Sequence, residues 1–138
     1  MMTTTTRIAA LLSLLLVGAV RPASAADARI FEMRTYTTEP GKLDTLNARF
    51  RNHTLALFKK HGMEVVGFWE PVDKEAGAGE KLVYILSHKS REAAAASWKA
   101  FVADPDWVKA KADSEKDGKV LSKIESVFLT ATDYSPIK

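Results

Sequence analysis

Two segments with strand-like composition carry apolar side chains on both of their faces, and this restricts the possible folds. Successive side chains of a strand point to opposite faces of a sheet. The segment KLVYILSHK (81–89) places on alternate faces Leu82, Tyr84 and Leu86 against Val83 and Ile85. The segment MEVVGFWE (63–70) places on alternate faces Val65 and Trp69 against Val66 and Phe68. A sheet built from such strands must be covered on both sides.

The other segments give the order strand, helix, strand, strand, helix, strand. The predicted ranges are a strand at 29–37, a helix at 40–60, the strands at 63–70 and 81–89 joined by a loop at 71–80, a helix from Ser90 that is interrupted at Asp104-Pro105, and a strand at 123–132. This order is the α+β, ferredoxin-like βαββαβ arrangement, a four-stranded antiparallel sheet with both helices on one face. The helices cover one face only. A second copy of the sheet would cover the other, which predicts a homodimer whose two sheets enclose a cavity.

The first 25 residues have the layout of a secretory signal peptide. Arg7 precedes the apolar run Ile8–Val20, and Ala23-Ser24-Ala25 follows as a cleavage signal. The run is shorter than the roughly 20 residues of a membrane-spanning helix. We expect cleavage after Ala25, secretion or periplasmic location, and no membrane association of the domain at 26–138.

Charge and composition remove several classes of function. Loss of Arg7 and Arg21 lowers the formal charge from +3 by two, to +1, which gives no electrostatic argument for a nucleic-acid partner. The chain has no Cys, which excludes thiol nucleophiles and Cys-based zinc sites. No pair of His residues has metal-ligand spacing, so neither a metal nor another cofactor is expected.

The first strand, RIFEMRTYT (29–37), carries the main candidate site. Glu32, Arg34 and Tyr36 share one of its faces. Facing an enclosed dimer space, they could bind an anionic small molecule, with Arg34 as the anion fork and Tyr36 as a hydrogen-bond donor. The alternative is that Glu32 and Arg34 pair with each other or with cross-strand neighbours and have a structural role.

Other candidates come from isolated His and aromatic residues. His53 lies near the apolar stripe of the first helix and could act as a general base, as could Glu32. His61 and His88 are weaker candidates at element ends. Trp69 could form a pocket wall, with Tyr84 as a further ligand contact, whereas Trp98 and Trp107 have the helical spacing of core residues.

Three sequence blocks resemble the NIPSNAP family. They are FEMRTYTTEPGKLDTLNARF, KKHGMEVVGFWEP and SWKAFVADPDWVKAKADSE, and the resemblance extends over about residues 29–136. It implies a dimeric α+β barrel, a fold that cofactor-free monooxygenases and haem-degrading enzymes share, and it implies no particular activity. Many members carry an Arg a few residues after D-P-x-W, where this chain has Lys109 and Lys111.

Three functions are therefore compatible with the sequence. The first is an exported homodimer that binds a small, partly apolar molecule in the barrel. The second is a cofactor-independent oxygenase or isomerase that uses the same cavity, with His53 or Glu32 as the base and Arg34 stabilising an oxyanion. The third is a protein-interaction module.

Overall fold

The computed structural model describes residues 29–138, and the predicted signal peptide lies outside the described residues. The elements are β1 (Ile30–Thr38), α1 (Leu43–Arg49), the π-helical segment η2 (Phe50–Thr54), α2 (Leu55–Lys60), β2 (Glu64–Trp69), the 3₁₀ turn η3 (Lys74–Ala76), β3 (Lys81–His88), α3 (Arg91–Ala103), α4 (Pro105–Ser114) and β4 (Leu121–Thr130). No helix within this part of the chain is long and apolar enough to cross a membrane.

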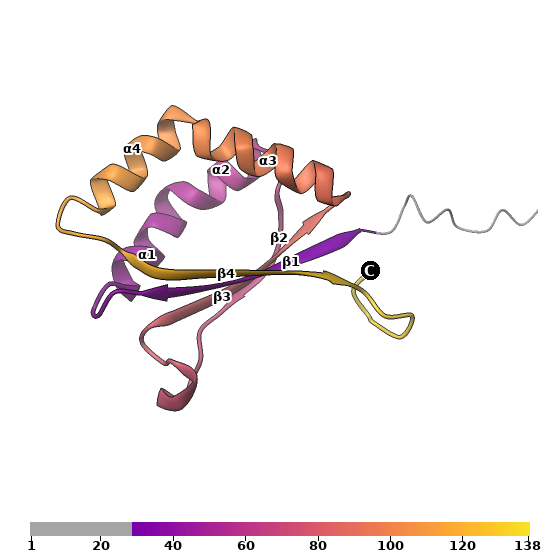
Figure 1. Ribbon diagram of the computed structural model, residues 1–138, viewed down its shortest axis with the longest axis horizontal. Helices are drawn as coiled ribbons and strands as arrows, with labels where there is room; N and C mark the ends of the chain where they lie inside the picture. Colours follow the sequence, from indigo (N-terminus) through magenta and orange to yellow (C-terminus); the bar gives the residue numbers. More distant parts are fainter. Residues whose placement is uncertain (1–28) are drawn as a thin grey trace, which may run out of the picture.

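The four strands form one antiparallel sheet in the order β2-β3-β1-β4, and all the helices lie on one of its faces (Figure 1). This confirms the predicted ferredoxin-like α+β fold. The opposite face carries no helix, and we call it the open face. The loop between β2 and β3 and the C-terminal residues extend on the side of the open face.

Short-range signals in the sequence mark the helix ends. Gly62 follows His61, the C-cap residue of α2, and has a left-handed φ of +72°, a conformation that favours glycine. The Ser90 hydroxyl accepts a hydrogen bond from the Ala93 backbone N–H at the start of α3. At the start of α4, the Asp104 carboxylate accepts a hydrogen bond from the Asp106 backbone N–H, and Pro105 is the first residue of the helix.

Two features of the chain differ from the predicted pattern. The first helix contains the π segment η2, which adds a residue to one helical turn, and no periodicity argument predicted it. In β2, an irregularity between Val65 and Gly67 shifts the register. As a result Val65 and Phe68 both lie on the helix side, although simple alternation predicted opposite faces.

The core lies between the helix layer and the sheet and is rich in aromatic rings. Phe58 is fully buried and contacts Phe50, Tyr84, Trp98 and Phe101, with ring centroids 5.3–6.0 Å apart. These residues come from the first helical stretch, β3 and α3. The aromatic cluster therefore holds the helices on the sheet.

The open face is apolar and partly exposed. Met33 of β1 lies between Ile85 of β3 and Val127 of β4 in the register of the sheet. Val127 is 49% exposed, and Trp69, at the end of β2, is 51% exposed with its ring packed across Gly67. The strands are thus apolar on both faces, as the sequence indicated, and the open face is only partly covered within the subunit, where the C-terminal residues lie near Phe31.

Candidate functional site

The Glu32 carboxylate is the centre of a buried polar network that joins β1 to three other elements. It accepts hydrogen bonds from Arg34 Nη1 (2.6 Å), Trp98 Nε1 of α3 (2.7 Å), Ser126 Oγ of β4 (2.8 Å) and His88 Nε2 of β3 (3.0 Å). Glu32 itself is only 2% exposed. Because an ionised carboxylate only accepts, Nε2 is the protonated nitrogen of His88 in this bond.

These contacts determine the charge of Glu32. Burial alone raises the pKa of its carboxyl, but the hydrogen bonds that it accepts, led by the bond from His88, outweigh burial and lower the pKa to about 2. Glu32 is therefore a carboxylate at neutral pH. A carboxylate with so low a pKa is a poor general base, so the structure disfavours Glu32 as a catalytic base.

Arg34 lies beside Glu32 in a fixed position. Its guanidinium stacks over the Trp98 ring, 4.2 Å from the ring centroid, while Nη1 forms the ion pair with Glu32. About 15% of the side chain is exposed, and the buried Nε has no hydrogen-bond partner within the described residues. The pairing that the sequence left as an alternative thus exists. Within the described residues, the pairing engages Nη1 of the guanidinium alone.

The prediction of what surrounds the polar face of β1 was wrong. The sequence predicted that Glu32, Arg34 and Tyr36 would face the space between two sheets, but they point toward the helices of their own subunit. Trp98 of α3 covers the Glu32–Arg34 pair. The set with Phe31 and Met33 forms the open face instead. Alternation separates the two sets, but it does not determine which set the helices cover.

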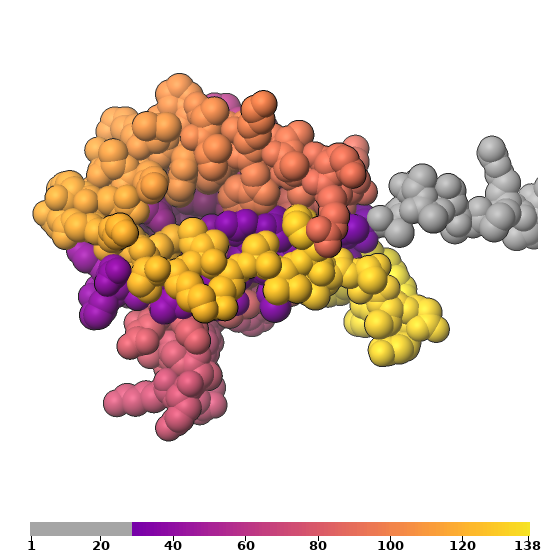
Figure 2. Space-filling model, in the orientation of Figure 1, coloured from indigo at the N-terminus to yellow at the C-terminus, as the bar shows by residue number. Residues whose placement is uncertain are grey.

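Next to Arg34, the helix-facing side of β4 is partly uncovered, and we call this region the recess. Ile124, Ser126 and Phe128 pair with Tyr36, Arg34 and Glu32, so their side chains share the helix-facing side of the sheet. Ile124 is nevertheless 51% exposed, and Ser126 is exposed although it binds buried Glu32. The helices therefore leave most of this edge uncovered, although Arg91 of α3 lies over the Phe128 ring at 4.5 Å. Figure 2 shows atoms of β1 in the hollow between α3–α4 and β4.

Tyr36 and Tyr84 belong to the core next to this recess. The Tyr84 hydroxyl donates to the Tyr36 hydroxyl at 2.8 Å, and the two rings meet edge to face. Burial raises the pKa of Tyr84 well above its ordinary value. Tyr84 is fully buried and Tyr36 is 8% exposed, so of the two phenols only Tyr36 has access to solvent.

The other predicted site residues do not converge on Arg34. His53 is exposed and lines a groove against α4 with Asp106, Lys109 and Asp113. Although His53 lies near the apolar stripe in the sequence, its side chain is exposed in this groove and is not part of the Glu32–Arg34 network. Trp69 lies across Gly67 on the open face. The residues that the structure describes contain no group of three or more His, Asp or Glu side chains that could hold a metal ion.

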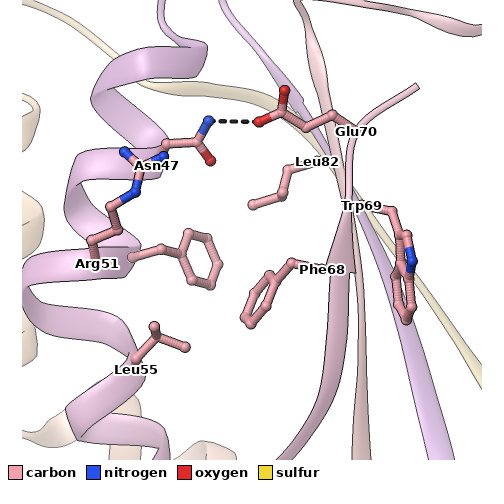
Figure 3. Close-up of a pocket in the computed structure, with 8 residues that line it drawn as sticks. Asn47, Arg51, Leu55, Phe68, Trp69, Glu70 and Leu82 are labelled. Carbon is pink, nitrogen blue, oxygen red and sulfur yellow. Dashed lines mark hydrogen bonds between the residues drawn. The ribbon is translucent and has the colours of Figure 1, made fainter. Parts of the chain in front are cut away.

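A pocket of about 430 Å³ lies on the other side of the core, between the first helical stretch and β2 (Figure 3). Its lining residues are Asn47, Phe50, Arg51, Leu55, Phe68, Trp69, Glu70 and Leu82. The Asn47 amide donates to the Glu70 carboxylate at 2.6 Å. The ring of Trp69 points away from this pocket, toward the open face.

Sequence reasoning missed several partners of the site. Trp98 was predicted as core only, but its indole N–H also binds Glu32. Ser126 and His88 were not connected with Glu32. Arg49 is buried, donates to Ser114 and stacks on Trp107, as Arg34 stacks on Trp98. The W-x-x-F-x-x-D-P-x-W block contains both tryptophans and was the one available signal.

The chain is similar to members of one protein family in both sequence and structure. The sequence model of the NIPSNAP family matches residues 31–136. The structure resembles that of an uncharacterised NIPSNAP-like domain protein from Burkholderia xenovorans, with a TM-score of 0.68, 17% identity, and coverage of 80% of this chain and 90% of that one. The structure also resembles that of a NIPSNAP family protein from Agrobacterium tumefaciens, with a TM-score of 0.68 and 21% identity. The match covers 81% of this chain and 96% of that one.

A more distant structure is that of SnoaB, a cofactor-independent oxygenase from Streptomyces nogalater. It has a TM-score of 0.51 and 16% identity, and the match covers 79% of this chain and 98% of that one. At this identity the likeness concerns the fold, which is that of dimeric α+β barrel proteins. No curated protein matches the chain.

The low pKa of Glu32 predicts how the stability of the protein depends on pH. Because the folded-state pKa is about 2 and the ordinary value is 4.5, its contribution to stability is present above about pH 4.5 and is lost as the pH falls toward 2. We expect Glu32→Gln to lower the unfolding free energy at pH 7 by about 2–3 kcal/mol and to flatten its decline between those pH values. Urea denaturation at stepped pH measures this. Glu64→Gln, at an exposed glutamate, serves as the control, and parallel profiles of Glu32→Gln and wild type would contradict the assignment.

Proposed function

The chain belongs to the NIPSNAP family, and from the geometry of its Arg34 we propose that it binds a small anionic molecule in the recess beside β4. The observation that carries this proposal is the state of Arg34. It is a fixed cation, about 15% exposed, and Glu32 binds it through Nη1 alone. A guanidinium presents its donors in a planar fork that matches a carboxylate.

The surroundings of Arg34 favour an anion with an apolar body. Trp98 holds the guanidinium by stacking, and Glu32 orients it through one nitrogen only. Ile124 and Phe128 add apolar surface on β4. A preorganised site of this kind loses little conformational entropy on binding. Glu32 neutralises part of the positive charge, so affinity must come from directed hydrogen bonds as well as from charge.

Binding is better supported than catalysis. The oxygenase or isomerase alternative needs a base, but Glu32 has a pKa of about 2 and His53 lies in a separate groove against α4. The likeness to SnoaB extends to the fold alone. No specific observation on the helix layer favours the third hypothesis, a protein-interaction module.

The proposed binding can be followed through the Trp98 indole N–H, which is next to Arg34. We expect benzoate, an aromatic carboxylate, to shift this resonance in proton–nitrogen NMR spectra. Arg34→Lys keeps the charge beside Glu32 but removes the planar fork, and should weaken benzoate binding about tenfold or more. Arg29→Gln, at an exposed surface cation, should leave the affinity unchanged. An unmoved Trp98 resonance, or wild-type affinity in a folded Arg34→Lys protein, would refute the proposal.

We further propose that two subunits pair through their open faces. The support is the set of exposed apolar side chains on this face, Trp69 of β2 and Val127 and Leu129 of β4, since apolar patches on soluble proteins commonly mark interfaces. A second copy of the same sheet is the simplest cover, because homodimers with twofold symmetry are the commonest assemblies. Such pairing would leave the recess beside β4, which lies on the helix side, open to ligands.

Val127→Lys tests this pairing. The residue is 49% exposed in the subunit, so a lysine there should not prevent folding, but it would place a charge in the dimer interface. We expect light scattering to give a dimer for the wild type and a monomer for Val127→Lys. Val108→Lys makes the same change at an exposed position of α4 and should remain dimeric. A monomeric wild type would exclude the proposed pairing.

We also propose that residues 1–25 direct export to the periplasm or the medium. Arg7, the apolar run after it and the Ala23-Ser24-Ala25 signal support this. N-terminal sequencing of the protein from a fractionated native host should begin at Ala26. A start at Met1 or Met2 in the cytosolic fraction would reject export.

A further inference from the structure

We propose that the pocket between the first helical stretch and β2 is a second ligand site, for an amino acid with an apolar side chain. Neither the family match nor the proposed anion site assigns a role to this pocket. It lies on the opposite side of the Phe50–Tyr84 aromatic core from the recess. The two proposals can therefore succeed or fail separately.

The body of the pocket is apolar and is not filled by the chain itself. Phe50 and Phe68 meet edge to face at 5.2 Å, and Leu55 and Leu82 extend the same lining. Leu55 remains 39% exposed and Phe68 is partly exposed, although both sit in a concave surface. Partly exposed apolar side chains around a cavity of about 430 Å³ are typical of small-molecule sites.

One end of the pocket is polar and carries both signs of charge. In Figure 3, Asn47, Arg51 and Glu70 gather at this end, whereas Leu55 and Phe68 lie along the rest. The Asn47 amide donates to one oxygen of Glu70 and fixes the carboxylate at the pocket rim. Within residues 29–138, the second oxygen of Glu70 and the guanidinium of Arg51 form no hydrogen bond with another side chain.

This distribution matches a zwitterion that carries an apolar group. A carboxylate can accept from the Arg51 guanidinium, and an ammonium can donate to Glu70. The apolar side chain of the ligand would then lie against Phe50 and Phe68, where removal of apolar surface from water favours binding. A purely anionic or purely cationic ligand would satisfy only one of the two charged groups at the rim.

The helix that forms one wall has the π segment at this position. Phe50 and Arg51, the first two residues of η2, both line the pocket. Single π turns inside α-helices are common at functional sites, because the extra residue changes where neighbouring side chains point. Here the same turn contributes an apolar wall residue and the cation at the rim.

Binding of L-phenylalanine can be measured by NMR from the Leu55 and Leu82 methyl resonances, with the Trp98 indole as a reporter for the other site. We expect the methyl resonances to shift and the Trp98 resonance to stay in place. Phenylethylamine, which lacks the carboxylate, and 3-phenylpropionate, which lacks the ammonium, should each bind at least about tenfold more weakly. Glycine, which lacks the apolar group, should not bind measurably.

Two variants assign the recognition to the rim residues. Arg51→Gln should bring the affinity for L-phenylalanine down to that for phenylethylamine, and Glu70→Gln should bring it down to that for 3-phenylpropionate. Arg29→Gln and Glu64→Gln change an exposed ion pair elsewhere and should have no effect. Equal binding of the three aromatic probes, wild-type affinity in both rim variants, or no methyl shift at millimolar L-phenylalanine would each overturn the proposal.

Discussion

The burial of one carboxylate, that of Glu32, is the interaction on which the arrangement of this domain depends. A buried charge is tolerated only when hydrogen bonds replace the water that it has lost. Here the donors come from four different elements: β1, β3, β4 and α3. Displacement of any one of them would leave the charge partly unsatisfied. The network therefore fixes the position of α3 over the sheet more specifically than apolar packing alone could.

The same network explains why Arg34 is suited to binding and Glu32 is not suited to catalysis. The four hydrogen bonds stabilise the ionised form of Glu32, so its affinity for a proton is low. Arg34 contributes one nitrogen to that network and stacks on Trp98. Its orientation is thus determined before any ligand arrives. Because the helices leave most of β4 uncovered, about 15% of the Arg34 side chain remains exposed next to the recess.

The order of elements, the helix caps and the apolar character of both sheet faces were predictable, because short-range signals determine them. Ser90 and Gly62 act within a few residues of their own positions. The surroundings of Glu32 were not predictable. Its partners Trp98 and Ser126 lie 66 and 94 residues away in the sequence. From alternation alone, the face of β1 with Phe31 and Met33 resembles the core face because it is the more apolar of the two. The face with Glu32 can be buried only because tertiary contacts compensate its charge, and alternation does not reveal those contacts.

Both proposed sites depend on one aromatic layer. The ring of Tyr36 lies 5.6 Å from the Arg34 guanidinium on one side and 6.1 Å from the Phe50 ring on the other, and Phe50 lines the pocket beside β2. The ring of Tyr84, on β3, packs against the rings of both Tyr36 and Phe50. Close-packed interiors resist small displacements, so this layer separates a recess that contains a paired cation from a pocket with an apolar floor and a charged rim. The sheet thus offers two chemically different surfaces on its helix side, and the buried phenol pair is the boundary between them.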